Sequence, residues 1–292
     1  MMSLPFFLVF TDLDGTLLDH HTYGWEEAIP AIELCRTRGV LIILVSSKTR
    51  AEMATLRRRL SISAPFISEN GGGIFFLKEI FKDPPSGSSP ADTPGFSPGD
   101  STELSTWREK GLWILSLGVS YPRLIKALQE IRNELGWRMK GFSDMGVEEI
   151  SRLTGLDKEG ARLATMREYD EPFMIEGEKP TDLAPLERAA EQRGLLITSG
   201  GRFYHLQGKN DKAKGMELIT EWYQEYHKEV LTVALGDSPN DFGMLERADF
   251  PVLIRSRRSF PDLKKRIPKL RITDDIGPKG WNSAVLSILS RN

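Results

Sequence analysis

Short apolar runs of strand length alternate with amphipathic stretches of helix length towards both ends of the chain. The apolar runs lie at residues 6–10, 40–45, 66–67, 230–235, 252–254 and 270–272. Helices are predicted over 26–38, which is followed by Gly39 as a suitable C-cap, and over 50–60. Buried strands that alternate with helices are typical of a parallel sheet covered by helices. The two ends of the chain therefore predict an α/β domain.

The middle of the chain has a different composition and a different order of elements. Residues 83–105 are rich in Pro, Ser, Gly and Asp, which predicts a loop or linker. Strands are then expected at 112–117, 172–175, 195–199 and 203–206, and helices at 121–135, 151–168 and 183–193. This mixed order predicts an α+β domain over 83–205, inserted into an α/β domain formed by 1–82 and 206–292.

Composition narrows the function classes and the compartment. The 292 residues carry a formal net charge of −2, which favours neither a nucleic-acid surface nor a polybasic membrane patch. The single cysteine, Cys35, leaves no internal disulfide and favours a reducing compartment. The apolar run at 6–10 is too short for a membrane span and lacks the basic start of a signal peptide. We therefore expect a cytoplasmic protein, while the sequence leaves its oligomeric state open.

A pair of carboxylates, Asp12 and Asp14, lies at the end of the first predicted strand. Since strand side chains alternate between faces, both carboxylates point the same way, and two like charges this close favour a bound cation. A calcium loop is excluded because its twelfth position would be Tyr23 rather than Glu. The pair indicates a phosphoryl-transfer site, with a helix cap and the metal site of a nucleotide-sugar transferase as alternatives.

A second acidic group, Asp237 and Asp241, follows the apolar run at 230–235. Ligands of open parallel sheets bind outside the carboxyl ends of the strands, so these residues would converge with Asp12 and Asp14 if the two strands are neighbours. Four carboxylates form a site of hard oxygen donors that suits Mg²⁺. The alternative interpretation of this segment is an ordinary Asx turn with a helix cap.

Two more strand ends offer groups that suit an anionic substrate. Ser46 and Ser47 come after the strand at 41–45 and directly before a predicted helix, a position that favours anion binding. Asn70 and Gly71 follow the strand at 66–67, where glycine permits close approach of a ligand to the backbone. A simple N-cap and a hairpin turn are the structural alternatives.

A lysine that neutralises a transferring phosphoryl group would complete such a site. Lys209, Lys212 and Lys214 all precede a helix predicted over 216–226. The residues alone leave these three candidates open.

The order of these segments resembles the haloacid dehalogenase superfamily of phosphohydrolases, in particular its Cof-type members with a class IIB cap. The resemblance is carried by Asp12-Leu-Asp-Gly-Thr, Ser46, Lys212 and Gly236-Asp-Ser-Pro-Asn-Asp241. Within that group, residues 45–52, 69–73, 167–173, 200–205 and 277–282 resemble mannosyl-3-phosphoglycerate phosphatases. The family pattern Asp-Lys-Gly-Lys favours Lys212, although Ala213 replaces the glycine. Lys212 also places apolar Met216 and Ile219 on the core-facing side of the helix.

The resemblance implies a Rossmann-like core with a parallel sheet, an inserted α+β cap and a mechanism. Asp12 would attack phosphorus and form an aspartyl-phosphate, while Asp14 would protonate the leaving oxygen and then deprotonate water. Mg²⁺ would be held by Asp12, the backbone carbonyl of Asp14 and Asp237, with Asp241 in support. Ser46 and Lys212 would bind the phosphoryl oxygens.

The substrate implied by the resemblance is a small phosphorylated glycosyl-glycerate, mannosyl or glucosyl. Its expected contacts are Ser47, Asn70, Gly71, Arg167, Arg202 and His205. Guanidinium groups suit a carboxylate because they bind it in a bidentate manner. A sugar-phosphate phosphatase, a phosphomutase and a phospho-accepting signalling module remain alternatives at this point.

Overall fold

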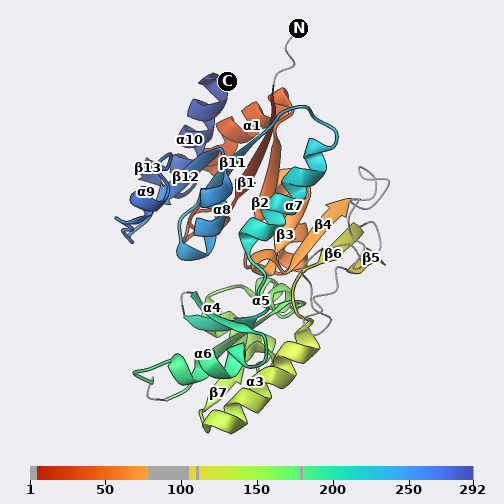
Figure 1. Ribbon diagram of the computed structural model, residues 1–292, viewed down its shortest axis with the longest axis vertical. Coiled ribbons are helices and arrows are strands. Elements are labelled where there is room, and N and C mark those ends of the chain that lie inside the picture. Colours follow the sequence, from red (N-terminus) through yellow and green to blue (C-terminus); the bar gives the residue numbers. More distant parts are fainter. Residues whose placement is uncertain (1–4, 78–104, 110–111, 178–179, 201, 292) are drawn as a thin grey trace.

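A computed structural model describes residues 5–77, 105–109, 112–177, 180–200 and 202–291 of the chain. The described residues form two lobes along the longest axis of the molecule, and both ends of the chain lie at the upper lobe (Figure 1).

The upper lobe is built on a nine-stranded sheet. Its strands are β1 (Phe6–Thr11), β2 (Leu41–Val45), β3 (Phe66–Ser68), β4 (Gly73–Leu77), β5 (Ser105–Glu109), β6 (Leu112–Ser116), β11 (Val230–Gly236), β12 (Phe250–Arg255) and β13 (Arg271–Ile276). They are ordered β13-β12-β11-β1-β2-β3-β4-β6-β5. Neighbours from β13 to β3 are parallel, whereas β4, β6 and β5 extend the sheet in antiparallel fashion.

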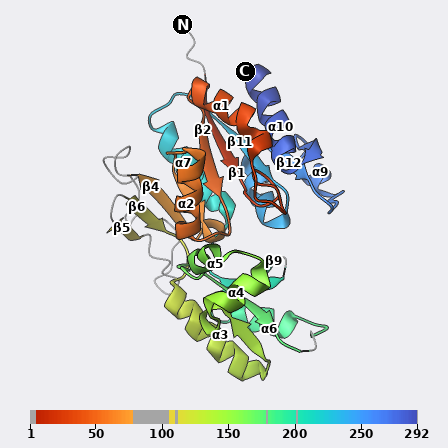
Figure 2. The same cartoon turned by 180° about the vertical axis from the view of Figure 1, so that it is seen from behind.

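Helices cover both faces of this sheet, as the apolar runs predict. They are α1 (Ile29–Arg38), α2 (Arg50–Leu60), α7 (Lys212–Gln224), α8 (Phe242–Arg247), α9 (Leu263–Arg266) and α10 (Gly277–Arg291). Phe7 and Val9 of β1 pack with α1, α2 and α10, whereas Leu8 and Phe10 pack with α7, α8 and α9. The first layer is seen in Figure 2 and the second in Figure 1. The covering of both faces confirms the predicted α/β class. Strands buried on both faces read as nearly continuous apolar runs, and such runs are what the sequence contains.

The lower lobe is a smaller α+β unit. Its strands are β7 (Met139–Gly141), β8 (Asp170–Ile175), β9 (Leu196–Gly200) and β10 (Phe203–Gln207), and its helices are α3 (Tyr121–Leu135), α4 (Val147–Thr154), α5 (Lys158–Ala164) and α6 (Ala184–Glu191). The sheet is antiparallel in the order β7-β8-β10-β9. Helices α3 and α6 pack on one apolar cluster of this lobe, and α4 and α5 on another.

The predicted boundary at residue 83 places one strand in the wrong lobe. The strand expected at 112–117 was counted in the inserted domain, but β6 pairs with β4 in the large sheet, and β5 pairs with β6. Strands β4 and β6 are separated in sequence by the Pro/Ser/Gly-rich stretch, so no short turn signal marks their pairing. That stretch, apart from Ser105, lies outside the described residues.

Two predicted helices differ from the structure, one by a break within it and one in its starting residue. The helix expected over 151–168 is two helices, since Gly155 ends α4 with a φ of 81° and Asp157 caps α5 by accepting from the Gly160 N–H. Helix α7 begins at Lys212 rather than at 216 because Asp211 is its N-cap and accepts from the Lys214 N–H at 2.7 Å. Strands β4, β5 and β7 were not predicted.

Candidate active site

The carboxyl ends of the central strands bring the predicted site residues to one edge of the large sheet. Thr11 of β1 is in register with Leu44 of β2 and with Leu235 of β11. Asp12 therefore lies level with the last residues of these neighbouring strands, Val45 and Gly236, and its N–H donates to the Leu235 carbonyl at 2.9 Å. This edge faces the lower lobe (Figure 1).

Three aspartates from two strand ends form a compact acidic group. Asp12, Asp237 and Asp241 each offer one carboxylate oxygen, and these oxygens lie within 4.8 Å of one another. The Lys212 Nζ lies 2.5 Å from Asp12 Oδ1 and 2.7 Å from Asp241 Oδ1. Lys214 instead points to solvent, 3.8 Å from Glu217. Of the lysines considered from the sequence, Lys212 is the one that the fold brings to the acidic group.

Burial controls the charge of this group. It raises the pKa of Asp12 to about 8, although the Lys212 ammonium opposes the shift. Burial and the neighbouring Asp241 also raise the pKa of Asp237. At Lys212 burial disfavours the charge, but Asp12 and Asp241 outweigh it and the pKa is raised. The fold thus holds these carboxylates close together despite their repulsion and desolvation, with the Lys212 ammonium between Asp12 and Asp241. Such a group suits a divalent cation that prefers oxygen ligands.

Asp241 also holds the turn in which it lies. Its Oδ2 accepts from the N–H groups of Asp237 and Ser238, both at 3.1 Å. A Cβ on Gly236 would lie 2.3 Å from the Asp241 Cβ, so the close approach requires glycine. The acidic segment is therefore a turn with its own cap, as in the alternative interpretation, and at the same time part of the acidic group.

Asp14 lies apart from these three side chains and has its own cation. Its Oδ2 is 2.9 Å from the Nζ of Lys48, and its Oδ1 is buried without a hydrogen-bond partner among the described residues. Burial disfavours the Lys48 charge, but Asp14 and Glu52 outweigh it and raise the pKa of the lysine. Lys48 had no predicted role, although its position two residues after Ser46 was a usable signal.

The loops after β2 and β3 are bonded to each other beside the acidic group. Ser46 is 1% exposed, and its Oγ accepts from the Lys48 N–H at 3.2 Å. The Ser46 carbonyl accepts from the Asn70 N–H at 3.0 Å. The Asn70 Oδ1 accepts from the Asn240 amide at 3.2 Å. Hydrogen bonds thus link Ser46 and Asn70 to the turn that holds Asp241, whereas the Ser47 carbonyl accepts from Arg167 of the lower lobe.

Gly71 lets the turn after β3 touch the start of α7. Its φ is 93°, and a Cβ would lie 2.1 Å from the backbone oxygen of Asp211.

We predict that Gly71→Ala lowers the free energy of unfolding by roughly 3 kcal/mol or more, because the strain of a positive φ and a clash with the backbone add. Gly39→Ala is the matched control, since its φ is 67° but no atom lies within 4 Å. Its expected cost is about 1 kcal/mol. Equal losses in urea unfolding would contradict the role of the contact.

Two of the three residues expected to bind substrate in the lower lobe meet on a buried carboxylate. Asp170 is fully buried, and its Oδ2 lies 3.3 Å from Arg167 Nη1 and 2.8 Å from His205 Nδ1. Arg167 Nη1 also donates to the Ser47 carbonyl at 2.9 Å. The structure does not bring Arg202 to this group, because it is exposed and donates to the Leu153 carbonyl. Asp170 belongs to the segment 167–173 that carries the family resemblance, but it was not predicted as a site residue.

A second buried carboxylate joins the lobes next to the site. Glu69 is fully buried and accepts from the N–H groups of Glu168 and Tyr169 in the lower lobe. Burial raises its pKa to about 8, although Arg167 opposes the shift. Arg50 pairs with Glu168 at 3.0 Å across the same interface. Glu69 was not predicted to have a role of its own.

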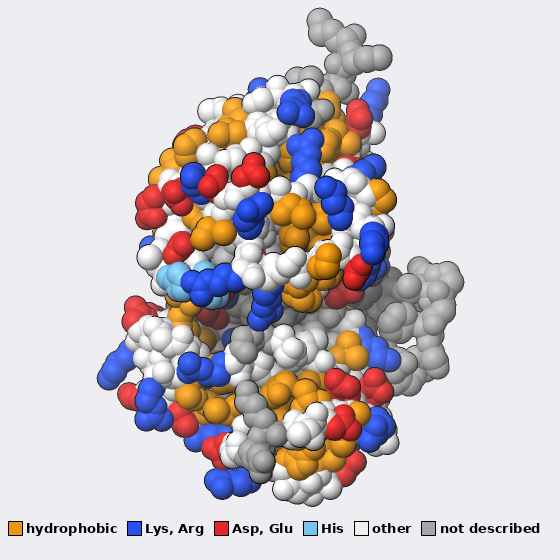
Figure 3. All heavy atoms as spheres, turned by 90° about the vertical axis from the view of Figure 1, so that its left-hand side faces the viewer, with side chains coloured by type: hydrophobic (Ala, Val, Ile, Leu, Met, Phe, Trp, Pro, Cys, Tyr) orange, Lys and Arg blue, Asp and Glu red, His pale blue; other side chains and the backbone are white. Residues whose placement is uncertain are grey.

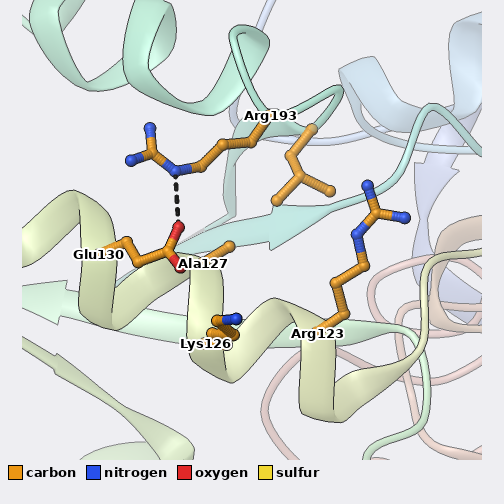
Figure 4. Close-up of a pocket in the computed structure, with 6 residues that line it drawn as sticks. Arg123, Lys126, Ala127, Glu130 and Arg193 are labelled. Atoms are coloured by element: carbon orange, nitrogen blue, oxygen red, sulfur yellow. Dashed lines mark hydrogen bonds and ion pairs between the residues drawn. The ribbon is translucent and has the colours of Figure 1, made fainter. Parts of the chain in front are cut away.

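The cavity shown in Figure 4 lies elsewhere. It has a volume of about 380 Å³ on the lower lobe and is lined by Arg123, Lys126, Ala127, Glu130, Arg193 and Leu195. Arg193 is already paired with Glu130 at 3.3 Å. None of the predicted site residues lines this cavity.

The surface gives two further observations. Charged side chains of both signs are interspersed over both lobes on the face shown in Figure 3. Among the helices of the described ranges, none combines the length and apolar character that a membrane crossing requires.

Comparisons with known proteins place the chain among phosphatases. A family model described as haloacid dehalogenase-like hydrolase matches residues 9–85. A glucosyl-3-phosphoglycerate/mannosyl-3-phosphoglycerate phosphatase of Methanococcoides burtonii is 38% identical over 98% of this chain and 98% of its own length. A mannosyl-3-phosphoglycerate phosphatase of Pyrococcus furiosus is 35% identical over 86% of this chain and 92% of its own.

Solved structures share the fold at lower sequence identity. A phosphatase of the haloalkanoate (HAD) enzyme superfamily from Bacteroides thetaiotaomicron has a TM-score of 0.62 and 17% identity, covering 99% of this chain and 96% of its own. This likeness concerns the fold.

Proposed function

We propose, since the chain belongs to the family of haloacid dehalogenase-like phosphatases, that it hydrolyses the phosphate monoester of mannosyl-3-phosphoglycerate or glucosyl-3-phosphoglycerate. The observation that carries the proposal is the separation of two neighbouring aspartates. Asp12 lies in the acidic group beside Lys212, whereas Asp14 lies outside that group with one buried oxygen unpaired. Adjacent carboxylates in different surroundings suit different roles.

The roles follow from these surroundings. An Asp12 oxygen attacks phosphorus and the ester bond breaks, which gives an aspartyl-phosphate and a free alcohol. Asp14 gives its proton to the departing oxygen and later takes a proton from the water that hydrolyses the aspartyl-phosphate. Lys212 and Ser46 bind the phosphoryl oxygens, because their polar groups lie next to Asp12 at the same strand edge.

A divalent cation fits the acidic group on the chemistry of its donors. Asp12, Asp237 and the backbone carbonyl of Asp14 would hold Mg²⁺, and Asp241 would support them. When bound, the ion lessens the repulsion between the Asp12 carboxylate and the dianionic phosphate. The acidic oxygens within 4.8 Å of one another are the observation that supports this assignment.

We assign substrate selection to the lower lobe, which we take as a cap inserted into the phosphatase core. Arg167 and His205 are its proposed contacts near the site, and Ser47, Asn70 and Gly71 are those of the core. Arg202 is retained as a contact of the sugar end. A cytoplasmic location completes the proposal, and the free, buried Cys35 suits it.

Phosphate release from a panel of esters with and without Mg²⁺ tests the proposal. We expect the kcat/KM of glycosyl-3-phosphoglycerates to exceed that of simple sugar phosphates by at least about tenfold. One additional hydrogen bond to a charged group of the substrate contributes about that factor. Chelation by EDTA should remove the activity and Mg²⁺ should restore it.

The alternatives give different results in the same assay. No phosphate release from any glycosyl-3-phosphoglycerate would refute the proposed substrate. Phosphate transfer that depends on a sugar bisphosphate would identify a mutase, and a long-lived phosphoenzyme without turnover would identify a signalling module.

A further inference from the structure

Lys48 is a cation in the site that has no task in the hydrolysis described above. It follows Ser46 and Ser47 in the loop between β2 and α2, and its side chain is 16% exposed. Its Nζ lies 2.9 Å from Asp14 Oδ2 and 5.2 Å from the centre of the Tyr23 ring. Within the described part of the chain, Asp14 is its single ion-pair partner. An ammonium has three donors, so Lys48 can bind a further acceptor.

The two lysines of the site contact different aspartates. Lys212 contacts Asp12 and Asp241, where the phosphoryl group is transferred. Lys48 contacts Asp14, which protonates the oxygen of the leaving alcohol. A cation at Asp14 therefore lies on the leaving-group side of the phosphate, whereas Lys212 lies on the side of the nucleophile.

The proposed leaving group carries an anion close to its ester oxygen. In a 3-phosphoglycerate the carboxylate is separated from the ester oxygen by two carbon atoms. An Asp14 that touches the ester oxygen thus brings this carboxylate within reach of a cation that touches Asp14. We propose that Lys48 binds the substrate carboxylate and selects esters whose leaving alcohol carries an acid group, an inference that rests on the proposed function.

The two arginines expected to bind substrate, Arg167 and Arg202, already bond to acceptors of the protein. Arg167 Nη1 bonds to the Ser47 carbonyl and to Asp170, and its Nε donates to the Ala164 carbonyl at 3.0 Å. Arg202 is exposed and bonds within its own lobe. A lysine is a compact charge on a flexible stem, so Lys48 can reach a carboxylate while it stays near Asp14.

The test compares the carboxylate substrate with its neutral, isosteric carboxamide. On wild type, kcat/KM for glucosyl-3-phosphoglycerate should exceed that for the carboxamide by about 10- to 100-fold, the range of a charge-assisted hydrogen bond. Lys48→Gln should lose most of this preference, mainly through a higher KM for the carboxylate. Lys48→Arg, which keeps the charge, should retain part of it. Lys228→Gln, an exposed lysine that precedes β11 at the opposite edge of the sheet, should retain all of it.

The outcomes separate this inference from the proposed function. An equal loss on both substrates in Lys48→Gln would mean that Lys48 acts only through Asp14, which overturns the inference and leaves the phosphatase intact. A wild type that releases no phosphate from either ester refutes the proposed function itself. Thermal melting checks that the variants fold. If they do not, product inhibition of wild type decides, because glucosylglycerate should inhibit at least about tenfold better than its carboxamide, and equal inhibition would overturn the inference.

Discussion

Asp12→Asn is expected to reduce kcat by roughly 10⁴-fold or more, the scale seen when an enzyme loses its nucleophile. An amide has the shape of the carboxylate but cannot form the phosphoryl-enzyme bond. The stability of the fold should stay the same or increase, because burial raises the pKa of Asp12 to about 8 and a neutral side chain suits that place. The amide oxygen can still accept from the Lys212 ammonium, 2.5 Å away in the parent protein.

This combination of lost activity and retained stability is expected of a residue that acts in catalysis rather than in folding. It is measured by phosphate release at saturating substrate and Mg²⁺, together with urea unfolding in EDTA. Asp274→Asn, an exposed aspartate, is the matched control and should change neither quantity. An Asp12→Asn enzyme as active as wild type would exclude covalent catalysis at this residue.

The convergence of the acidic side chains could be predicted because it depends on where each buried strand ends along the sequence. Asp12 and Asp237 each follow a buried apolar run, and parallel strands place such residues at the same edge. The position of Lys212 on the core side of its helix could also be inferred, since Met216 and Ile219 share its face. The family resemblance was confirmed by relatives that cover nearly the whole chain.

Contacts between the lobes could not be predicted in the same way. Glu69 and Asp170 are carboxylates that the sequence would place at the surface, yet both are fully buried because each accepts hydrogen bonds across long sequence separations. Arg167 was expected to face substrate, and its bond to Ser47 depends on how the lobes dock. Strand β6 was misplaced for a related reason, because its partner β4 is remote in sequence.

Lys212→Met should abolish activity and weaken the fold at the same time. The side chain is 1% exposed and contacts both Asp12 and Asp241, so its removal leaves two buried carboxylates without their ammonium. Breaking a buried ion pair in this way costs about 3–5 kcal/mol of unfolding free energy. Loss of the charge that faces the phosphoryl group should lower kcat by at least about 10³-fold.

Mg²⁺ provides the sharper measurement on this variant. A cation bound by the acidic oxygens compensates part of the missing ammonium, so Mg²⁺ should raise the unfolding free energy of Lys212→Met more than that of wild type. Lys214→Met is the matched control, because its side chain is 55% exposed and its partner Glu217 is 3.8 Å away. Its expected change is within about 0.5 kcal/mol. If Lys214→Met lost the activity and Lys212→Met kept it, the phosphoryl-binding lysine would be Lys214. The ammonium of Lys212 would then serve only to hold Asp12 and Asp241 together.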